Sequence, residues 1–346
     1  MISKIKLKSF RLFDSLDLDV SNPLVILSGK NATGKTSILE ALYLCSTGKS
    51  HRTNDLSTLI RKDDPFSIVE VKGDKQFKYV ISKDSKSLFI NKNEIKKISD
   101  FVGNLPEVLY SPDDISLIKG SKLDKRRFLD IEISLLDKIY LRNLNAYRKI
   151  LAERNEILKQ NTIDFNLLNV INERLSEYIK AIYNRRILFL DRMNELLKDI
   201  TLNLNSENIR LIYKSTYNPN DVLDSIKKHE KSDLFMKSTG IGSHRDEFII
   251  EMNQLDAKEY ASEGQSRLIC IAIKLALMEY IKEVSKKDVI LLLDDVFAAL
   301  DKTRIEKLVG YIHNSYQAFI TTTSVLEIPD ELLKNALVIR LEKKER

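Results

Sequence analysis

The sequence predicts an α/β protein that carries a helical lobe, and three observations predict this class. The short apolar run Leu24–Ser28 is followed by a glycine-containing loop and a helical pattern, the strand–loop–helix order of α/β folds. A second apolar run, Asp288–Leu293, is typical of a parallel strand buried on both faces. Between them, residues 122–200 contain neither proline nor glycine and repeat apolar residues at helical spacing.

The first 120 residues are expected to consist mainly of strands. Ile2–Ser9 and Leu16–Val20 alternate apolar and polar residues, as a half-buried strand does. A helix is predicted from Lys35 to about Leu44 because its apolar residues return every three or four positions. Further strands are expected at Ser67–Val71, Phe77–Ser82, Ser87–Ile90 and Glu107–Tyr110.

Residues 121–200 are predicted to form a helical lobe, or short arm, of two long antiparallel helices. The polar break at Asn161–Asp164 supplies the turn between them. The α/β pattern then returns, so residues 1–120 and 201–346 are assigned to one discontinuous head. Its expected later elements are Glu247–Met252, Gly264–Val284, Asp288–Leu293, Asp301–Asn314, Ala318–Thr321 and Ala336–Leu341.

Composition limits the class of protein further. The chain of 346 residues has a net charge of +6, and the positive excess lies in the first 200 residues. On charge alone this fits a polyanionic partner and, at least equally well, solvated lysines on a lysine-rich chain. No apolar run reaches the length of a membrane span, and the first residues lack the apolar core of a signal peptide. The two cysteines, Cys45 and Cys270, are expected to be reduced core residues of a cytoplasmic protein.

A phosphate-binding loop is the most specific motif. Its residues match G-x-x-x-x-G-K-[ST], a pattern that this composition produces by chance roughly 0.004 times. Backbone N–H groups and a helix N-terminus would surround phosphates, the lysine would reach the β- and γ-phosphates, and the threonine hydroxyl would bind Mg²⁺. The predicted ATP-binding residues here are Gly29, Lys30, Asn31, Ala32, Thr33, Gly34, Lys35, Thr36 and Ser37.

Two acids follow the second apolar strand. Asp294, at the end of Leu291–Leu293, has the position of a Walker B carboxylate that holds Mg²⁺ together with Thr36. Asp295 is placed to orient or deprotonate the attacking water. Asp295, Lys35 and Ser262 are therefore the predicted catalytic residues.

The segment Ala261–Arg267 resembles the signature motif of ABC-type ATPases. Gly264 lies 30 residues before Asp294, which matches the order and spacing of that superfamily. The resemblance implies that Ser262, Gly264 and Gln265 contact the γ-phosphate of ATP bound to a second subunit, so that ATP joins two heads. Ala298–Asp301 resembles the D-loop, which crosses such an interface; Asp301 is equally well placed to cap the next helix.

The narrower resemblance is to the RecF family, because the head is split by more than 200 residues and yet lacks a long coiled coil. The stretches that resemble this family span nearly the whole chain: Ser9–Arg11, Thr36–Ala41, Ser46–Thr53, Tyr110–Asp114, Lys119–Gly120, Lys125–Asp130, Gly242–Asp246 and Leu291–Asp301.

The resemblance implies an ABC-type head, a mixed sheet with an antiparallel β subdomain, and a function in DNA repair, replication and recombination. It implies a weak, DNA-stimulated ATPase whose ATP-dependent homodimer clamps duplex DNA at gaps. Its partners would be RecR, with RecO, in loading RecA. Arg11 resembles the residue that flanks the adenine in SMC-like heads.

The chain departs from the family pattern at several positions. Ala32 and Ser243 stand where the family usually has glycine and proline, and Glu263 stands where it has glutamine. No glutamine after Tyr110 has the Q-loop role, which Asp113 or Asp114 could fill. Threonines 321–323 occupy the place of the transporter switch histidine, so slow hydrolysis is expected.

Two pairs of polar residues have alternative interpretations. His51-Arg52 is either a nucleotide or DNA contact or part of a solvated loop. His244-Arg245 is either near the nucleotide or dimer seam, or belongs to a turn in which Arg245 pairs with a nearby acid. DNA contact would be made through phosphates, since no base-reading motif is present. The candidates are Lys122, Lys125, Arg126, Arg127, Arg142, Arg148, Arg185 and Arg186.

Three other classes of protein compete with this interpretation. The long split of the head and the missing switch histidine argue against the energy subunit of an ABC transporter. The arm is short for an SMC-like structural ATPase, whose hydrodynamic length would reveal it. A nuclease would need a metal-dependent domain, for which no part of the chain is left.

Overall fold

The computed structural model describes residues 1–204, 206–297, 300–313 and 315–342. The fold is mixed α/β, with the parallel and antiparallel strands in separate sheets. The chain forms two compact units. Unit 1 comprises residues 1–114, 203–206 and 263–346, and unit 2 comprises residues 115–202 and 207–262.

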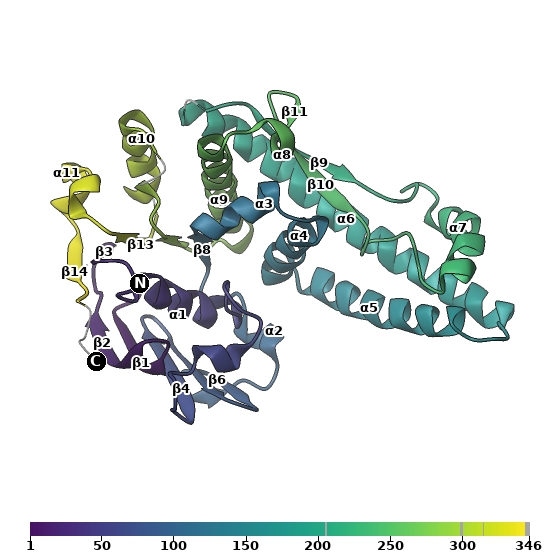
Figure 1. Cartoon of the computed structure of the whole chain (residues 1–346), viewed down its shortest axis with the longest axis horizontal. Coiled ribbons are helices and arrows are strands. Elements are labelled where there is room, and N and C mark those ends of the chain that lie inside the picture. Colours follow the sequence, from purple (N-terminus) through teal and green to yellow (C-terminus); the bar gives the residue numbers. More distant parts are fainter. Residues whose placement is uncertain (205, 298–299, 314, 343–346) are drawn as a thin grey trace. The chain divides into compact units, whose positions relative to one another are not determined.

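Unit 1 contains a parallel sheet of strand order β14-β3-β13-β12-β8 (Figure 1). Its strands are β3 (Leu24–Ser28), β8 (Glu107–Tyr110), β12 (Ile290–Leu293), β13 (Gln317–Thr322) and β14 (Leu337–Arg340). All side chains of β3, β8, β12 and β13 are buried, as expected for a sheet covered on both faces. The predicted parallel strands are thereby confirmed within two residues at each end.

The second sheet of unit 1 is antiparallel, with the order β2-β1-β4-β5-β6-β7. Its strands are β1 (Lys4–Phe10), β2 (Phe13–Asp19), β4 (Phe66–Lys72), β5 (Gln76–Ser82), β6 (Lys86–Ile90) and β7 (Asn93–Glu94). The helices of unit 1 are α1 (Lys35–Thr47), α2 (Ile98–Phe101), α9 (Glu263–Ser285), α10 (Lys302–His313) and α11 (Asp330–Leu333), with 3-10 turns at Leu56–Leu59, Pro112–Ile115 and Val325–Glu327.

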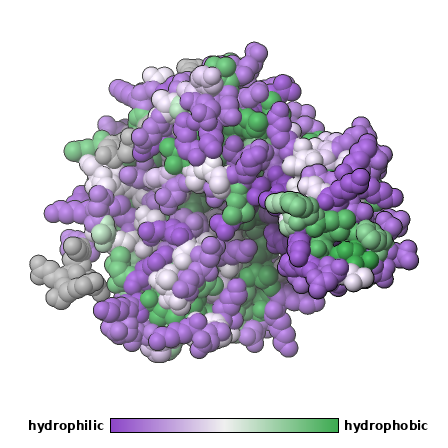
Figure 2. All heavy atoms as spheres, turned by 45° about the vertical axis from the view of Figure 1, so that its right-hand side comes forward, coloured by the Kyte–Doolittle hydropathy of each residue, from purple (hydrophilic) through white to green (hydrophobic). Residues whose placement is uncertain are grey.

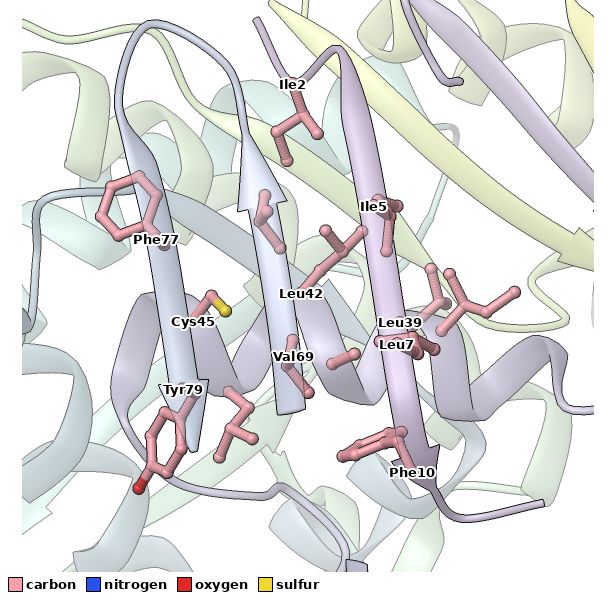
Figure 3. Close-up of a cluster of buried hydrophobic side chains, with 14 of the residues drawn as sticks. Ile2, Ile5, Leu7, Phe10, Leu39, Leu42, Cys45, Val69, Phe77 and Tyr79 are labelled. Atoms are coloured by element: carbon pink, nitrogen blue, oxygen red, sulfur yellow. The ribbon is translucent and has the colours of Figure 1, made fainter. Parts of the chain in front are cut away.

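Helix α1 packs against both sheets, because its sequence is apolar on more than one side. Leu39, Leu42 and Cys45 of α1 lie in one buried cluster with side chains of β1, β4 and β5 (Figure 3). The same cluster includes Leu292 and Phe319 of the parallel sheet. The helix that follows the phosphate loop is therefore fixed between two sheets, and this packing also fixes the end of the loop at Lys35. Both cysteines are free and buried, as predicted.

Unit 2 is built around two long antiparallel helices, α5 (Lys138–Leu158) and α6 (Phe165–Asn203) (Figure 1). Their turn lies at the predicted polar break. The other elements of the unit are α3 (Ser116–Lys119), α4 (Lys122–Leu136), β9 (Ile209–Lys214), α7 (Val222–Met236), β10 (Glu247–Met252), β11 (Leu255–Asp256) and α8 (Ala257–Tyr260), with the sheet order β11-β10-β9.

The structure differs from the predicted lobe in two respects. Helix α4 ends at Leu136, because the side chain of Asp137 accepts hydrogen bonds from the N–H groups of Ile139 and Tyr140 and starts a new helix. In addition, residues 207–262, which were assigned to the head, pack with the long helices in unit 2. A buried ion pair between Arg154 and Asp233 holds them there, with N and O 2.7 Å apart.

Charged and polar side chains cover most of the face that Figure 2 shows. Among the residues that the structure describes, no helix combines the length and apolar character needed to cross a bilayer.

Candidate nucleotide site

The phosphate loop connects β3 to α1, and its two glycines are required by close approaches. A Cβ at Gly29 would lie 2.4 Å from the carbonyl oxygen of Leu341. A Cβ at Gly34 would lie 2.4 Å from a ring carbon of Phe13, and Gly34 also has a left-handed φ of 97°. No side chain caps the N-terminus of α1. These features leave backbone N–H groups at the loop, as phosphate binding requires.

Lys35 is folded back into the loop that precedes it. Its Nζ donates hydrogen bonds to the carbonyl oxygens of Gly29, at 2.6 Å, and Lys30, at 3.0 Å. Burial lowers the pKa of Lys35, an effect opposed by the nearby carboxylates of Asp295 and Asp294. The ammonium group therefore lies inside the loop and within the field of both acids.

The two motifs, 258 residues apart, meet at a pair of hydrogen bonds. Thr36 Oγ1 donates to the carboxylate of Asp294, with distances of 3.1 and 3.0 Å to its two oxygens. Strands β3 and β12 both flank β13 in the parallel sheet. The carboxyl ends of parallel strands share one edge, so the sheet topology itself brings the loop and the acids together.

The donor set at this position fits Mg²⁺. A hydroxyl and a carboxylate are hard oxygen ligands, and Mg²⁺ usually completes its shell with water and substrate phosphates rather than with a protein cage. Thr36 and Asp294 are the residues that would hold it. The described residues contain no cluster of three or more His, Cys, Asp or Glu side chains suited to a metal.

Thr321, one of the threonines that stand in place of the switch histidine, is part of this site. Its hydroxyl donates to Asp294 Oδ1 at 2.5 Å and accepts from the backbone N–H of Asp295 at 2.9 Å. The signal in the sequence was a hydroxyl directly after the apolar run Ala318–Ile320 of β13.

Ala32 has a φ of 65°, the left-handed region that favours glycine. Because a side chain there costs about 1–2 kcal/mol, and glycine loses about 0.5–1 kcal/mol more on folding, we expect Ala32→Gly to stabilise unit 1 slightly. Thermal unfolding should shift upward by about 1–3 °C. Ala41→Gly, in the right-handed interior of α1, is the control and should lower the transition. A decrease in both variants would contradict strain at Ala32.

Arg11 forms a two-pronged ion pair with a buried carboxylate. Its Nε and one terminal nitrogen lie 2.8 and 2.7 Å from the oxygens of Glu40, which also accepts from Ser50. Arg11 thus ties the β1–β2 turn to α1, and its position beside an adenine stays a prediction. His51 packs edge-on against Tyr43, and burial lowers its pKa.

Asp114, a candidate for the Q-loop role, is engaged within unit 1. Its carboxylate accepts from the N–H of Ser111 at 2.7 Å and pairs with Lys274 of α9 at 2.9 Å. Its carbonyl oxygen accepts from the Cys270 thiol. Asp114 therefore fastens the end of β8 to α9.

The signature segment lies at the start of α9. Ser262 directly precedes the helix, and a Cβ added at Gly264 would meet no atom within 4 Å. Glu263 pairs with Arg267 one turn later, at 2.6 Å. Gln265 is half-buried. Contact with a second subunit stays a prediction for Ser262, Gly264 and Gln265.

Asp301 caps helix α10, one of its two predicted roles. Its Oδ1 accepts from the N–H of Arg304 at 3.0 Å, and its other oxygen pairs with the same side chain. Ala298 and Ala299 of the proposed D-loop lie outside the described residues.

The His244–Asp246 segment belongs to a polar network within unit 2. Burial lowers the pKa of His244 to about 4, and its Nδ1 lies 2.6 Å from the Tyr147 hydroxyl. Asp246 accepts from the hydroxyls of Tyr213 and Tyr217, at 2.6 and 2.8 Å. The turn interpretation is therefore favoured, although the expected partner of Arg245 is not found among the ion pairs of the described residues.

The structure separates the DNA candidates by exposure. Arg186 is 1 % exposed, so the prediction of DNA contact is wrong for this residue. Lys125 is 5 % exposed, and its burial argues against DNA contact there as well. Arg126 is half-buried and donates to the carbonyl oxygen of Asp246. The exposed candidates are Lys122, Arg127, Arg142, Arg148 and Arg185; Lys122, Arg148 and Arg185 form ion pairs with Glu247, Asp130 and Asp137.

Comparisons with known proteins agree on one family. The family model described as "RecF/RecN/SMC N terminal domain" matches residues 1–338. The DNA replication and repair protein RecF of Acholeplasma laidlawii is 40% identical over 325 residues, covering 93% of each chain. The protein of the same name from Clostridium perfringens is 35% identical over 353 residues, covering 98% of each chain.

Solved structures support the same assignment. The recombination mediator protein RecF with ATP, of the RecFOR pathway, matches with a TM-score of 0.88 and 28% identity, covering 95% of this chain and 93% of that one. The same protein with ATPrS matches at 0.87 and 28%, covering 99% and 96%. An SMC head bound to the C-winged helix domain of ScpA shares the fold, with a TM-score of 0.57 and 17% identity over 98% and 93%. The family model and these relatives show that this chain, whose two nucleotide-binding motifs meet at Thr36 and Asp294, belongs to the RecF family of ABC- and SMC-type heads.

Proposed function

We propose that this protein is an ATP-dependent DNA-binding protein of recombinational repair and replication, with weak ATPase activity. The observation that carries the proposal is the contact between Thr36 and Asp294, which joins a phosphate loop to a Walker B carboxylate across 258 residues. The structures of relatives with ATP and ATPrS support ATP as the nucleotide.

The residues of this chain divide the chemistry of ATP hydrolysis among them. Lys35 exchanges the carbonyl oxygens of Gly29 and Lys30 for phosphate oxygens, a charge-assisted contact. Thr36 and Asp294 would hold Mg²⁺, which when bound would supply positive charge to neutralise the phosphates. Asp295 accepts the proton of the attacking water. With threonine in place of a switch histidine, turnover is slow.

ATP also joins two copies of this protein in the proposed mechanism. Ser262 and the first N–H groups of α9 bind the γ-phosphate held by the other copy. The absence of any atom near a Cβ at Gly264 supports a surface that a second subunit can approach. Hydrolysis would part the two copies. Asp301 would lie at the seam while it caps α10.

The dimer binds duplex and gapped DNA through phosphates. Exposed basic side chains such as Arg127 and Arg142 contact DNA phosphates, so the affinity falls with salt concentration and does not depend on the DNA sequence. The relatives belong to a pathway named RecFOR, which supports RecO and RecR as partners and the loading of RecA at gaps as the task. The site of action would be the cytoplasm.

Molecular mass in solution, measured by light scattering with and without ATP and Mg²⁺, tests this proposal. The wild type should be a monomer that becomes a dimer with ATP, and DNA binding should rise with the dimer. Lys35→Ala should stay monomeric because its loop lacks the phosphate-binding ammonium. Ser262→Arg should bind ATP but stay monomeric, since the bulky cation blocks the signature surface.

Two results would overturn the mechanism. If the molecular mass is the same with and without ATP, the protein binds nucleotide but does not form the proposed DNA clamp. A Ser262→Arg protein that dimerises normally would show that the signature does not act on the other copy. Lys83→Ala removes an exposed lysine of unit 1 outside the phosphate loop; it is the control for Lys35→Ala and should dimerise.

A further inference from the structure

We infer that Thr321 is a positioning residue for ATP hydrolysis, because one hydroxyl fixes both acids of the Walker B pair. This inference rests on the proposed function and extends it to a residue outside the two motifs. Thr321 lies near the end of β13, in the strand between β3 and β12, and it is 1 % exposed.

The hydrogen-bond geometry allows only one arrangement of the hydroxyl. Asp295 N–H is a donor, so Thr321 Oγ1 must accept from it, at 2.9 Å. The hydroxyl proton is then directed at Asp294 Oδ1, at 2.5 Å. Thr36 Oγ1 lies at hydrogen-bond distance from both oxygens of the same carboxylate. The side chain that would hold the metal ion is thus held by two hydroxyls, one from α1 and one from β13.

The hydrogen bond from the Asp295 N–H to Thr321 affects Asp295, the residue proposed to accept the proton of the attacking water. Asp295 has a φ of 50°, a left-handed conformation that aspartate and asparagine adopt more readily than other non-glycine residues and that constraints from the surroundings stabilise. Its N–H bond to Thr321 is one such constraint, and it orients the peptide from which the Asp295 side chain projects. Without the hydroxyl, the acid loses one of the contacts that define its direction toward the attacking water.

Thr321 does not replace the switch histidine of transporters in this scheme. Its hydroxyl acts through Asp294 and Asp295 rather than through the phosphate, so its loss should change turnover more than nucleotide affinity. A misplacement of about 1 Å in a catalytic group lowers rates by about 100-fold. We therefore expect a fall of about 10- to 100-fold in kcat for Thr321→Val, with the KM for ATP changed less than about three-fold.

The experiment compares ATP turnover, ATP affinity and thermal unfolding of the full chain with three substitutions. Thr321→Val removes the hydroxyl at constant shape, and Thr321→Ser restores it and should return kcat to within about three-fold of the wild type. Thr201→Val is the matched control. Its buried hydroxyl lies on α6, outside the nucleotide site, and donates to the carbonyl oxygen of Leu197, so its kcat should stay near the wild-type value.

Each outcome separates this inference from the proposed function. A wild type that binds no ATP, or binds it without turnover, would overturn the proposed ATPase. A wild type that turns over ATP while Thr321→Val matches it in kcat would overturn only the role of Thr321. A rise in KM with unchanged kcat, or failure of Thr321→Ser to rescue, would do the same. Should Thr321→Val not fold, Thr321→Ala carries the same expectation, and wild-type kcat in that variant would refute it.

Discussion

Replacing Asp295 by asparagine should lower the rate of ATP turnover by about 100- to 10,000-fold, the range for loss of a general base. Asparagine keeps the shape of the side chain and tolerates the left-handed φ of 50° that this residue adopts. The backbone N–H that Thr321 accepts is also retained. The change therefore removes the proton acceptor and leaves the local fold in place.

Nucleotide binding and dimer formation should survive this change. Asp294, Thr36 and Lys35, which are proposed to hold the ion and the phosphates, are untouched. The ATP-bound dimer of Asp295→Asn should then outlive that of the wild type, because hydrolysis is the step that parts the two copies. Turnover by phosphate release and dimer lifetime by light scattering after dilution measure the two effects.

Asp288→Asn supplies the control for charge and chemistry. Asp288 is an exposed acid just before β12, whereas Asp295 follows the other end of that strand. Wild-type turnover is expected for Asp288→Asn. If Asp295→Asn hydrolyses ATP at the wild-type rate, another group orients the water; if it fails to bind ATP, the carboxylate serves binding rather than proton transfer.

The nucleotide site could be predicted from the sequence because its motifs are local. The loop glycines, the lysine and the acids after an apolar strand are each recognised from the residues next to them in the sequence. The parallel topology of the sheet then brings the two motifs together. Thr321 could not be given its role in the same way. Its function depends on the register that places Ile320 beside Leu293, and no local pattern contains that register.

The limits of the helical lobe were harder to predict, for a related reason. Residues 207–262 contain strands, and strands are expected in the head. The contacts of these residues with the long helices include buried polar groups as well as aromatic rings. The spacing did carry a signal for one of these. Arg186 falls between Ile182 and Phe189 on the buried side of α6, where a surface cation is not expected.

Arg186 should contribute strongly to the stability of unit 2. Its guanidinium lies 3.0 Å from the hydroxyls of Tyr140 and Tyr213, 3.0 Å from the Ser243 carbonyl oxygen, and 2.8 Å from Asp130. These contacts join α4, α5, α6, β9 and the loop before β10. Nearby tyrosine hydroxyls and acids raise the pKa of Arg186 against the opposing effect of burial, so the charge is permanent.

Arg186→Met should therefore destabilise unit 2 by about 3–5 kcal/mol, as expected when one partner of a buried ion pair is removed. The carboxylates of Asp130 and Asp246 would remain without their shared cation. Thermal unfolding should fall by about 6–20 °C for a unit of this size. Arg186→Lys should lose less, since it keeps the charge but not the fork of donors.

Arg185→Met is the matched control, one residue away on the same helix. Its side chain is 43 % exposed and pairs with Asp137 at 3.3 Å, an arrangement worth at most about 1 kcal/mol. We expect Arg185→Met to unfold near the wild-type temperature, and any loss of DNA binding in it to reflect a missing phosphate contact. Equal unfolding temperatures for the two methionine variants would refute the structural role of Arg186.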